Sequence, residues 1–230
     1  MEDYNQIIES LSIRYIKARN INILKSITIE NNYEVENTLL IVNKGSVRYG
    51  KLKEEANEGE VLFIPGGKMI SVTYGTGEAD IMNKEDFLSN KHNYFQSVDS
   101  IADSENESFS YVSFETKAFD SVNFFGSLDI PAFKITDNDG LVDLIHQVNS
   151  EANNDQPGKD RLVKIKTEEL VVELIRHILR QGLFVEQLAT NSTYFRDPRL
   201  IDLFGYIKEN LSNDLSNNCL LYTSPSPRDA

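Results

Sequence analysis

The sequence has little of what stabilises secreted or membrane-spanning proteins. Its single cysteine, Cys219, permits no internal disulfide. It has no run of about 18 apolar residues, so we expect no membrane-spanning helix. Acidic Glu2 and Asp3 follow Met1, where a signal peptide would have basic residues and an apolar segment. These absences predict a cytoplasmic protein that does not contact a membrane.

Basic side chains are also scarce. The chain has 23 Lys and Arg against 36 Asp and Glu, which gives a net charge of −13. An acidic chain is repelled by the phosphate backbone of nucleic acids. These 230 residues alone are therefore not expected to bind DNA strongly.

The hydrophobic content of 40% over 230 residues is sufficient for one large or two small domains. In residues 1–19, Ile7, Ile8, Leu11 and Tyr15 lie close to the spacing of a helical face, which predicts a short helix or an N-terminal arm. From Asn20 the apolar residues alternate with polar ones. Residues 20–136 are therefore predicted to form a β-rich domain.

The stretch GEVLFIPGG, residues 59–67, organises that domain. It predicts a short buried strand, Val61 to Ile64, that must turn at Pro65 and the glycines after it. Upstream, an apolar run at 39–42 and a second strand at 46–49 flank Asn43-Lys44-Gly45. This pattern is typical of a β-hairpin.

The spacing of Gly59, Pro65 and Gly67 resembles the second motif of the cupin fold. The resemblance implies a β-barrel, and its alternative is any other protein built from β-hairpins. Barrels of this kind commonly take a small ligand at the mouth. Tyr33, Tyr49 and Phe63 are the candidate lining residues, with simple core packing as the alternative for each.

A metal-dependent cupin enzyme needs imidazole and carboxylate ligands in both motifs. Residues 31–34, Thr38 and Ile70 occupy the positions where those ligands would lie, and none of them is histidine. The three histidines, His92, His146 and His177, lie outside both motifs. No phosphate-binding loop or Gly-x-Ser-x-Gly nucleophile motif occurs either. The sequence therefore predicts a binding protein that is not an enzyme and holds no metal or other cofactor.

After Pro131 the apolar period changes from two to 3.6, which predicts a helical region over 137–195. Asp137-Asn138 is a candidate cap for a helix with an apolar stripe from Leu141 to Ala152. A longer helix over about 161–180 has two apolar stripes: Val171, Leu174, Ile175 and Ile178 on one, and Ile165, Val172 and Leu179 beside it. The second stripe predicts a homodimer contact, and packing within the same chain is the alternative.

A third helix is predicted to begin at Asp197-Pro198, with an apolar stripe from Leu200 to Leu211. The segment CLLYTSPSPRD, which begins at Cys219, resembles the translation of a transposase-type sequencing adapter. That resemblance implies that residues 219–230 are an artefact. The native part of this sequence then ends near Asn218, inside a gene that continues.

Residues 196–218 resemble the start of the DNA-binding domain of AraC-type transcription regulators. Tyr206, Ile207, Asn210, Leu215 and Ser216 carry this resemblance. It implies an α+β protein: a cupin-like sensor domain, connector helices and the first helix of a truncated helix-turn-helix domain. It also implies a small-molecule effector, a homodimer, and DNA binding by the intact protein but not by this chain. The alternative is a stand-alone, metal-free cupin-like protein that binds a small molecule.

Overall fold

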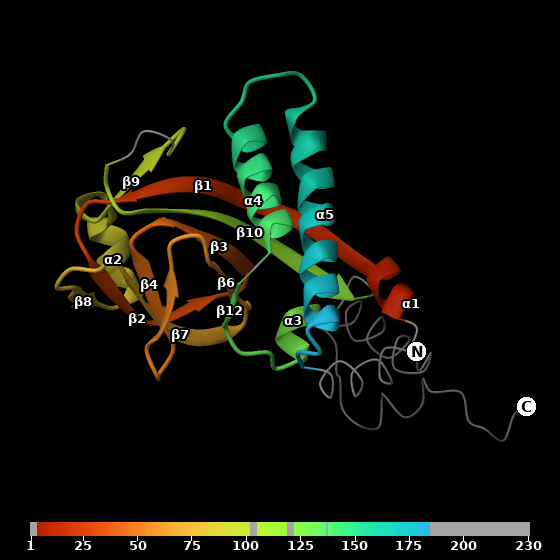
Figure 1. Ribbon diagram of the computed structural model, residues 1–230, viewed down its shortest axis with the longest axis horizontal. Coiled ribbons are helices and arrows are strands. Elements are labelled where there is room, and N and C mark those ends of the chain that lie inside the picture. Colours follow the sequence, from red (N-terminus) through yellow and green to blue (C-terminus); the bar gives the residue numbers. More distant parts are fainter. Residues whose placement is uncertain (1–3, 102–104, 119–121, 137, 185–230) are drawn as a thin grey trace, which may run out of the picture.

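A computed structural model describes residues 4–101, 105–118, 122–136 and 138–184 of the chain. Two β-sheets face each other, and two long helices lie side by side against one of them (Figure 1). The fold is therefore α+β with mostly antiparallel sheets, as the sequence predicts.

The described elements follow one another along the chain in this order: α1 (Tyr4–Glu9), β1 (Leu11–Ile23), β2 (Ile27–Glu34), β3 (Asn37–Lys44), β4 (Ser46–Tyr49), β5 (Glu54–Asn57), β6 (Val61–Ile64), β7 (Lys68–Tyr74), β8 (Asp80–Met82), α2 (Lys84–Asn90), the 3₁₀ turn η1 (Lys91–Asn93), β9 (Phe95–Val98), β10 (Ser108–Ala118), β11 (Val122–Asn123), α3 (Phe124–Ser127), β12 (Phe133–Ile135), α4 (Asp139–Ala152) and α5 (Lys159–Arg180).

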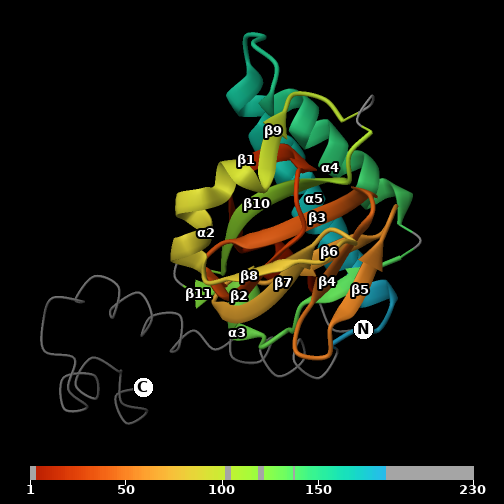
Figure 2. The same ribbon diagram turned by 90° about the vertical axis from the view of Figure 1, so that its left-hand side faces the viewer.

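The first sheet has the strand order β12-β6-β3-β10-β1-β9, with β11 paired to β10, and the second has the order β5-β4-β7-β2-β8. Figure 2 looks from the end where α2 lies and shows the two sheets with the long helices behind them. The predicted barrel is not closed, because no hydrogen-bonded ladder joins the two sheets in the described part of the chain. The strands at the sheet edges are only three or four residues long, so each ladder ends there.

Strand β6 spans Val61–Ile64, as predicted, and lies between β3 and β12. The turn after it brings two backbones into close contact. A Cβ atom at Gly66 would lie 2.0 Å from the carbonyl oxygen of Val35. The Gly66 N–H also donates a hydrogen bond to Asn37 Oδ1 at 3.0 Å. Only glycine fits at this position.

The predicted hairpin at Gly45 is wrong. Strand β3 belongs to the first sheet and β4 to the second, so Gly45, with φ of +92°, carries the chain from one sheet to the other. The apolar run of β3 is covered on both faces, with Leu39 and Ile41 toward the helices and Leu40 and Val42 toward the second sheet. A continuous apolar run is typical of a strand buried on both sides.

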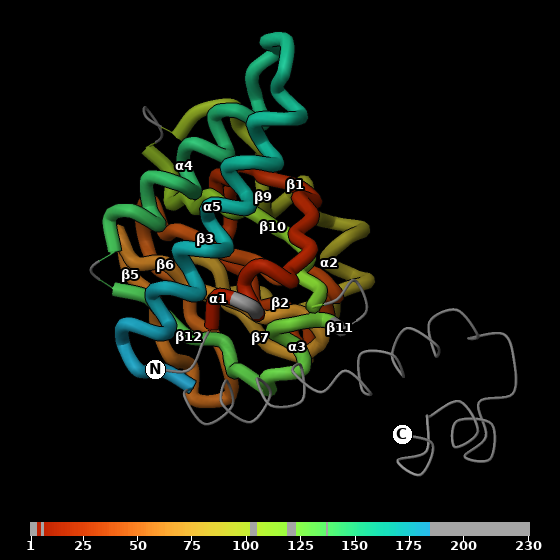
Figure 3. The backbone as a smooth tube through the Cα atoms, turned by 90° about the vertical axis from the view of Figure 1, so that its right-hand side faces the viewer, coloured from red at the N-terminus to blue at the C-terminus, as the bar shows by residue number. Residues whose placement is uncertain are grey.

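Helices α4 and α5 cover the outer face of the first sheet (Figure 3). Asn138 caps α4 by accepting a hydrogen bond from the Leu141 N–H, which confirms the predicted start. The first apolar stripe of α5 is buried, as predicted, at Val171, Leu174, Ile175 and Ile178. None of the helices in the described ranges is long and apolar enough to cross a membrane.

The N-terminal segment differs from the prediction. The helix covers only Tyr4–Glu9, and residues 11–19 belong to β1, which continues to Ile23. Every second residue of this part of β1, namely Leu11, Ile13 and Tyr15, packs against the apolar core between the first sheet and helices α4 and α5. We call this cluster the helical core. The apolar residues Ile7, Ile8, Leu11 and Tyr15 fit a helical spacing by coincidence. The predicted helix at Asp197 and the tail after Asn218 lie outside the described residues.

Candidate functional site

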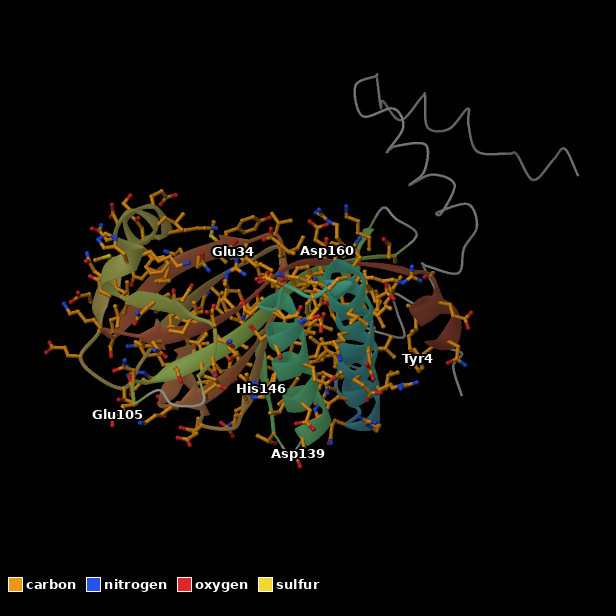
Figure 4. All side chains as sticks on the ribbon, turned by 90° about the horizontal axis from the view of Figure 1, so that it is seen from above. Tyr4, Glu34, Glu105, Asp139, His146 and Asp160 are labelled. Atoms are coloured by element: carbon orange, nitrogen blue, oxygen red, sulfur yellow. The ribbon has the colours of Figure 1, made fainter. Side chains whose placement is uncertain are left out.

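A cavity of about 160 Å³ opens between the two sheets beside α2. Strands of both sheets line it, and α2 with the η1 turn covers one side. Its lining residues are Lys17, Ile29, Asn32, Glu34, Glu36, Thr38, Leu40, Ile64, Tyr74, Lys84, Phe87, Leu88, Lys91, Phe95, Phe109, Tyr111 and Ser113. In Figure 4, Glu34 lies on the part of the molecule formed by the sheets, between α2 and the long helices.

Aromatic rings form the wall of this cavity. Tyr74 stacks on Phe109 with ring centroids 4.9 Å apart, and Phe95 meets both rings edge-on. Phe87 of α2 meets Phe95 at 5.2 Å. Burial raises the pKa of Tyr74 and of Tyr111 further above physiological pH, so both phenols are neutral hydrogen-bonding groups there. The wall suits the apolar body of a ligand.

A β-bulge in β1 directs Lys17 into the cavity. The β1 register shifts between Tyr15 and Lys17, so that Tyr15 faces Phe114 and Lys17 faces Ser113. Before the bulge, odd-numbered residues of β1 pack toward the helices; after it, Ile21 and Ile23 pack between the sheets. In a regular ladder Ile16 would face Ser113 instead, and Lys17 would lie on the same side of the sheet as Tyr15, away from the cavity.

A second bulge interrupts β2 and explains the position of Tyr33. Glu30 and Asn31 together face Ser71, and Asn31 adopts a left-handed φ of +49°. After this bulge Asn32 and Glu34 line the cavity. Tyr33 is 45% exposed on the outer face, so the structure does not place this predicted pocket residue in the cavity.

Two ammonium groups at the cavity rim lack an anionic partner. Lys84 pairs with Glu34 at 3.0 Å and donates to the carbonyl oxygen of Tyr33 at 2.5 Å. The ammonium groups of Lys17 and Lys91, in contrast, form no ion pair or hydrogen bond with any described residue. Burial lowers the pKa of Lys91, and the like charges of Lys17 and Arg19 lower it further. An anion held between Lys17 and Lys91 would relieve that repulsion.

A second cavity of about 300 Å³ lies on the other side of Ile64. Its lining consists of Tyr49, Gly50, Lys51, Leu52, Glu54, Ile64, Pro65, Lys68, Met69, Ile70, Pro131 and Ala132. Tyr49, the second predicted pocket residue, lines this cavity and donates a hydrogen bond to Glu54 Oε2 at 2.9 Å. Phe63, the third, is fully buried in the helical core, where its ring meets Phe125 at 4.9 Å. The three predicted pocket residues are not brought together.

The predicted dimer residues lie on the outer part of α5. Ile165 is 48% exposed, Val172 is half-buried, and Leu179 packs partly against the helical core. The structure therefore leaves Ile165 more accessible than Leu179, and the contact itself stays a prediction.

The residues at the positions where a cupin would carry metal ligands make contacts of another kind. Thr38 hydrogen-bonds to Ser113 at 3.1 Å, and Ile70 lines the second cavity. Among the described residues, no group of three or more His, Cys, Asp or Glu side chains is placed to hold a metal ion. His177 is buried and contacts Asn138 Nδ2 through its Nδ1 atom at 3.0 Å.

Sequence reasoning missed the cavity lysines, Lys17, Lys84 and Lys91. Lys84 and Lys91 stand among polar neighbours, as most solvated lysines do, and the direction of Lys17 depends on a bulge that no local pattern predicts. Phe87, Phe95 and Phe109 were detectable as apolar residues, but their meeting point depends on how the two sheets face each other.

The comparisons with known proteins leave the family open. No family model and no curated protein matches the chain. Solved structures of ToxT from Vibrio cholerae are similar to it. An apo variant from strain SCE256 has a TM-score of 0.41 and 8% identity, covering 92% of this chain and 69% of that one. ToxT from strain O395 has a TM-score of 0.33 and 10% identity, with 94% and 88% covered. The unsaturated fatty acid bound wild-type form from strain SCE256 has a TM-score of 0.31 and 9% identity, with 94% and 86% covered. A likeness this weak carries no argument about function.

Proposed function

We propose that this chain is the ligand-sensing and dimerisation part of an AraC-type transcription regulator. Two observations support the proposal. Residues 196–218 resemble the first helix of the DNA-binding domain of that family. The described residues form an α+β unit with a cavity between its sheets, as a sensor domain requires.

The unpaired lysines at the cavity rim carry the ligand assignment. The ligand is a small molecule with an apolar body and one anionic group. Its anion lies between the Lys17 and Lys91 ammonium groups, where charge-assisted hydrogen bonds are strong. Its apolar body lies against the rings of Tyr74 and Phe109. Lys84 already has a partner in Glu34 and contributes less.

In this proposal the chain binds its ligand and performs no chemistry on it. Subunits pair through the second stripe of α5, and the intact protein reads DNA with helices that follow residue 218. The protein acts in the cytoplasm, where it meets both effector and DNA.

Binding of simple carboxylates tests the ligand assignment. Calorimetry with hexanoate and octanoate should show binding, and hexanol and octanol should bind at least about tenfold more weakly, because they lack the charge. Lys17→Gln and Lys91→Gln should each weaken octanoate binding by about tenfold or more. Lys53→Gln removes the same charge from an exposed turn outside both cavities and should leave binding unchanged. Equal binding of the alcohols and carboxylates would contradict the proposal.

Long-read sequencing of the source locus tests the regulator assignment. We expect roughly 80 further residues with two helix-turn-helix units after Asn218. A stop codon near Asn218 would support the alternative, a stand-alone small-molecule-binding protein.

A further inference from the structure

The two cavities meet at one side chain. Among their lining residues, all in the described part of the chain, only Ile64 is common to both. Ile64 packs with Leu62 against the core between the sheets, whereas Val61 and Phe63 face the helices. Its side chain therefore lies between the aromatic cavity and the second cavity.

The second cavity can hold an apolar chain. Seven of its twelve lining residues are apolar: Leu52, Ile64, Pro65, Met69, Ile70, Pro131 and Ala132. Among the polar ones, Tyr49 is hydrogen-bonded to Glu54 and Lys68 forms an ion pair with Asp129. Ligand cavities in proteins commonly measure about 300–1,000 Å³. The aromatic cavity, at about 160 Å³, is smaller than that, and only together with the second cavity of about 300 Å³ does it fall well within the range.

Ile64 is held firmly in place. Strand β6 is hydrogen-bonded on both sides, and Ile64 itself faces Thr38 of β3. Pro65 follows directly, and the Gly66 backbone lies against Val35, so the strand end has no room to shift. A β-branched side chain also has few χ1 rotamers. Ile64 therefore does not move aside easily for a ligand.

We propose that Ile64 is the residue that sets ligand length, because it closes the aromatic cavity off from the second cavity. The inference rests on the proposed function of the aromatic cavity. A ligand whose anion lies at Lys17 and Lys91 extends along the rings until its apolar end reaches Ile64. Longer chains gain no affinity, because their additional methylene groups stay in water or force the Ile64 side chain out of its rotamer.

Straight-chain carboxylates from butanoate to hexadecanoate test this inference by calorimetry on the full chain. For the wild type, affinity should rise about fourfold with each methylene and then stop rising at one chain length. Ile64→Ala should move that limit to longer chains. A carboxylate two methylenes beyond the wild-type limit should bind roughly tenfold more tightly to Ile64→Ala than to the wild type.

A double variant shows whether the additional methylenes enter the second cavity. Ala132→Phe in the Ile64→Ala background places a ring in that cavity and should restore the wild-type limit. Ile81→Ala changes an exposed isoleucine outside both cavities and should leave the length profile unchanged. Circular dichroism confirms that each variant is folded.

The possible results separate the two claims. Binding of carboxylates with the same length limit in the wild type and in Ile64→Ala would overturn the role of Ile64 and leave the proposed function standing. A limit moved by Ile64→Ala but insensitive to Ala132→Phe would also overturn it, because the chain would not enter the second cavity. Failure of every carboxylate to bind the folded wild type would overturn the proposed function and this inference with it.

Discussion

The His177 imidazole joins the two long helices, because its Nδ1 atom accepts a hydrogen bond from the Asn138 side chain that caps α4. This bond requires the neutral ring. Burial lowers the pKa of His177, and the positive charge of Arg180 lowers it further. Burial also lowers the pKa of His146, where Asp143 acts in the opposite direction.

The lowered pKa of His177 makes the free energy of unfolding depend on pH. The neutral His177 ring stabilises the fold fully above the pKa of histidine in the unfolded chain, about 6.5. This stabilisation is lost as the pH falls toward the lower pKa of His177 in the folded protein. His177→Gln keeps an acceptor for Asn138 without a titrating group. Urea unfolding followed by circular dichroism should therefore show the wild type losing more stability than His177→Gln between about pH 7 and pH 5. Parallel losses in the two proteins would contradict the assignment.

Two glycines should respond to alanine in opposite directions. Gly66→Ala places a Cβ 2.0 Å from the Val35 oxygen and should lower the free energy of unfolding by about 3 kcal/mol. Gly140 lies in the first turn of α4, where a Cβ would meet only Asn138 Oδ1 at 3.5 Å. Gly140→Ala should raise stability by up to about 1 kcal/mol. Urea midpoints for the two variants check both signs, and a tolerated Gly66→Ala would show that the turn after β6 can relax.

At the scale of elements, α5 uses its two apolar stripes differently. The first is buried against the first sheet and α4, and the second remains partly in solvent at Ile165 and Val172. Leu179 packs partly against the core, so its replacement would affect folding as well as association. The accessible part of the second stripe is therefore the better test of the predicted dimer.

Replacing Ile165 and Val172 by Glu should weaken dimerisation by at least tenfold, or about 1.4 kcal/mol, and leave the fold intact. Light scattering at several concentrations measures the effect. Ile81→Glu is the matched control, because Ile81 is also exposed but lies on β8 of the second sheet. A wild type that is monomeric at high micromolar concentration, or a double variant that stays dimeric, would show that this contact is wrong.

In the molecule as a whole, the first sheet has the aromatic cavity on one face and helices α4 and α5 on the other. Tyr111 of β10 lines the cavity, and its neighbour Val112 packs against the helices. A ligand in the cavity therefore contacts the same strands that support α4 and α5. If the chain has the sensor role proposed above, this arrangement links its ligand directly to helices α4 and α5.

The 230-residue chain should not bind operator DNA. Its net charge of −13 repels phosphate, and in the family that residues 196–218 resemble, the helices that read bases come after the segment matching these residues. A gel-shift series at low salt on the promoter beside the gene should show no retardation below about 10 µM protein. Sequence-specific retardation that resists competitor DNA would contradict the assignment of residues 196–218.

The sequence by itself determined the elements whose signals are local. Val61–Ile64 between a glycine and Pro65, the Asn138 cap and the apolar stripe of α5 all appear in the structure at their predicted places. Each depends on residues within a few positions of one another, so periodicity and capping chemistry are sufficient to predict them. The absence of an internal disulfide also follows from the single cysteine.

Only the tertiary structure decided which side chains enter the cavity and which sheet each strand joins. A bulge adds one residue and reverses the inward and outward faces beyond it, which is why Lys17 and Glu34 point inward and Tyr33 points outward. Gly45 permits a tight hairpin and a crossing between sheets equally well, and the pairing of β3 with β6 and β10 selects the crossing. These outcomes depend on contacts between residues far apart in the chain, whose energies no local pattern records.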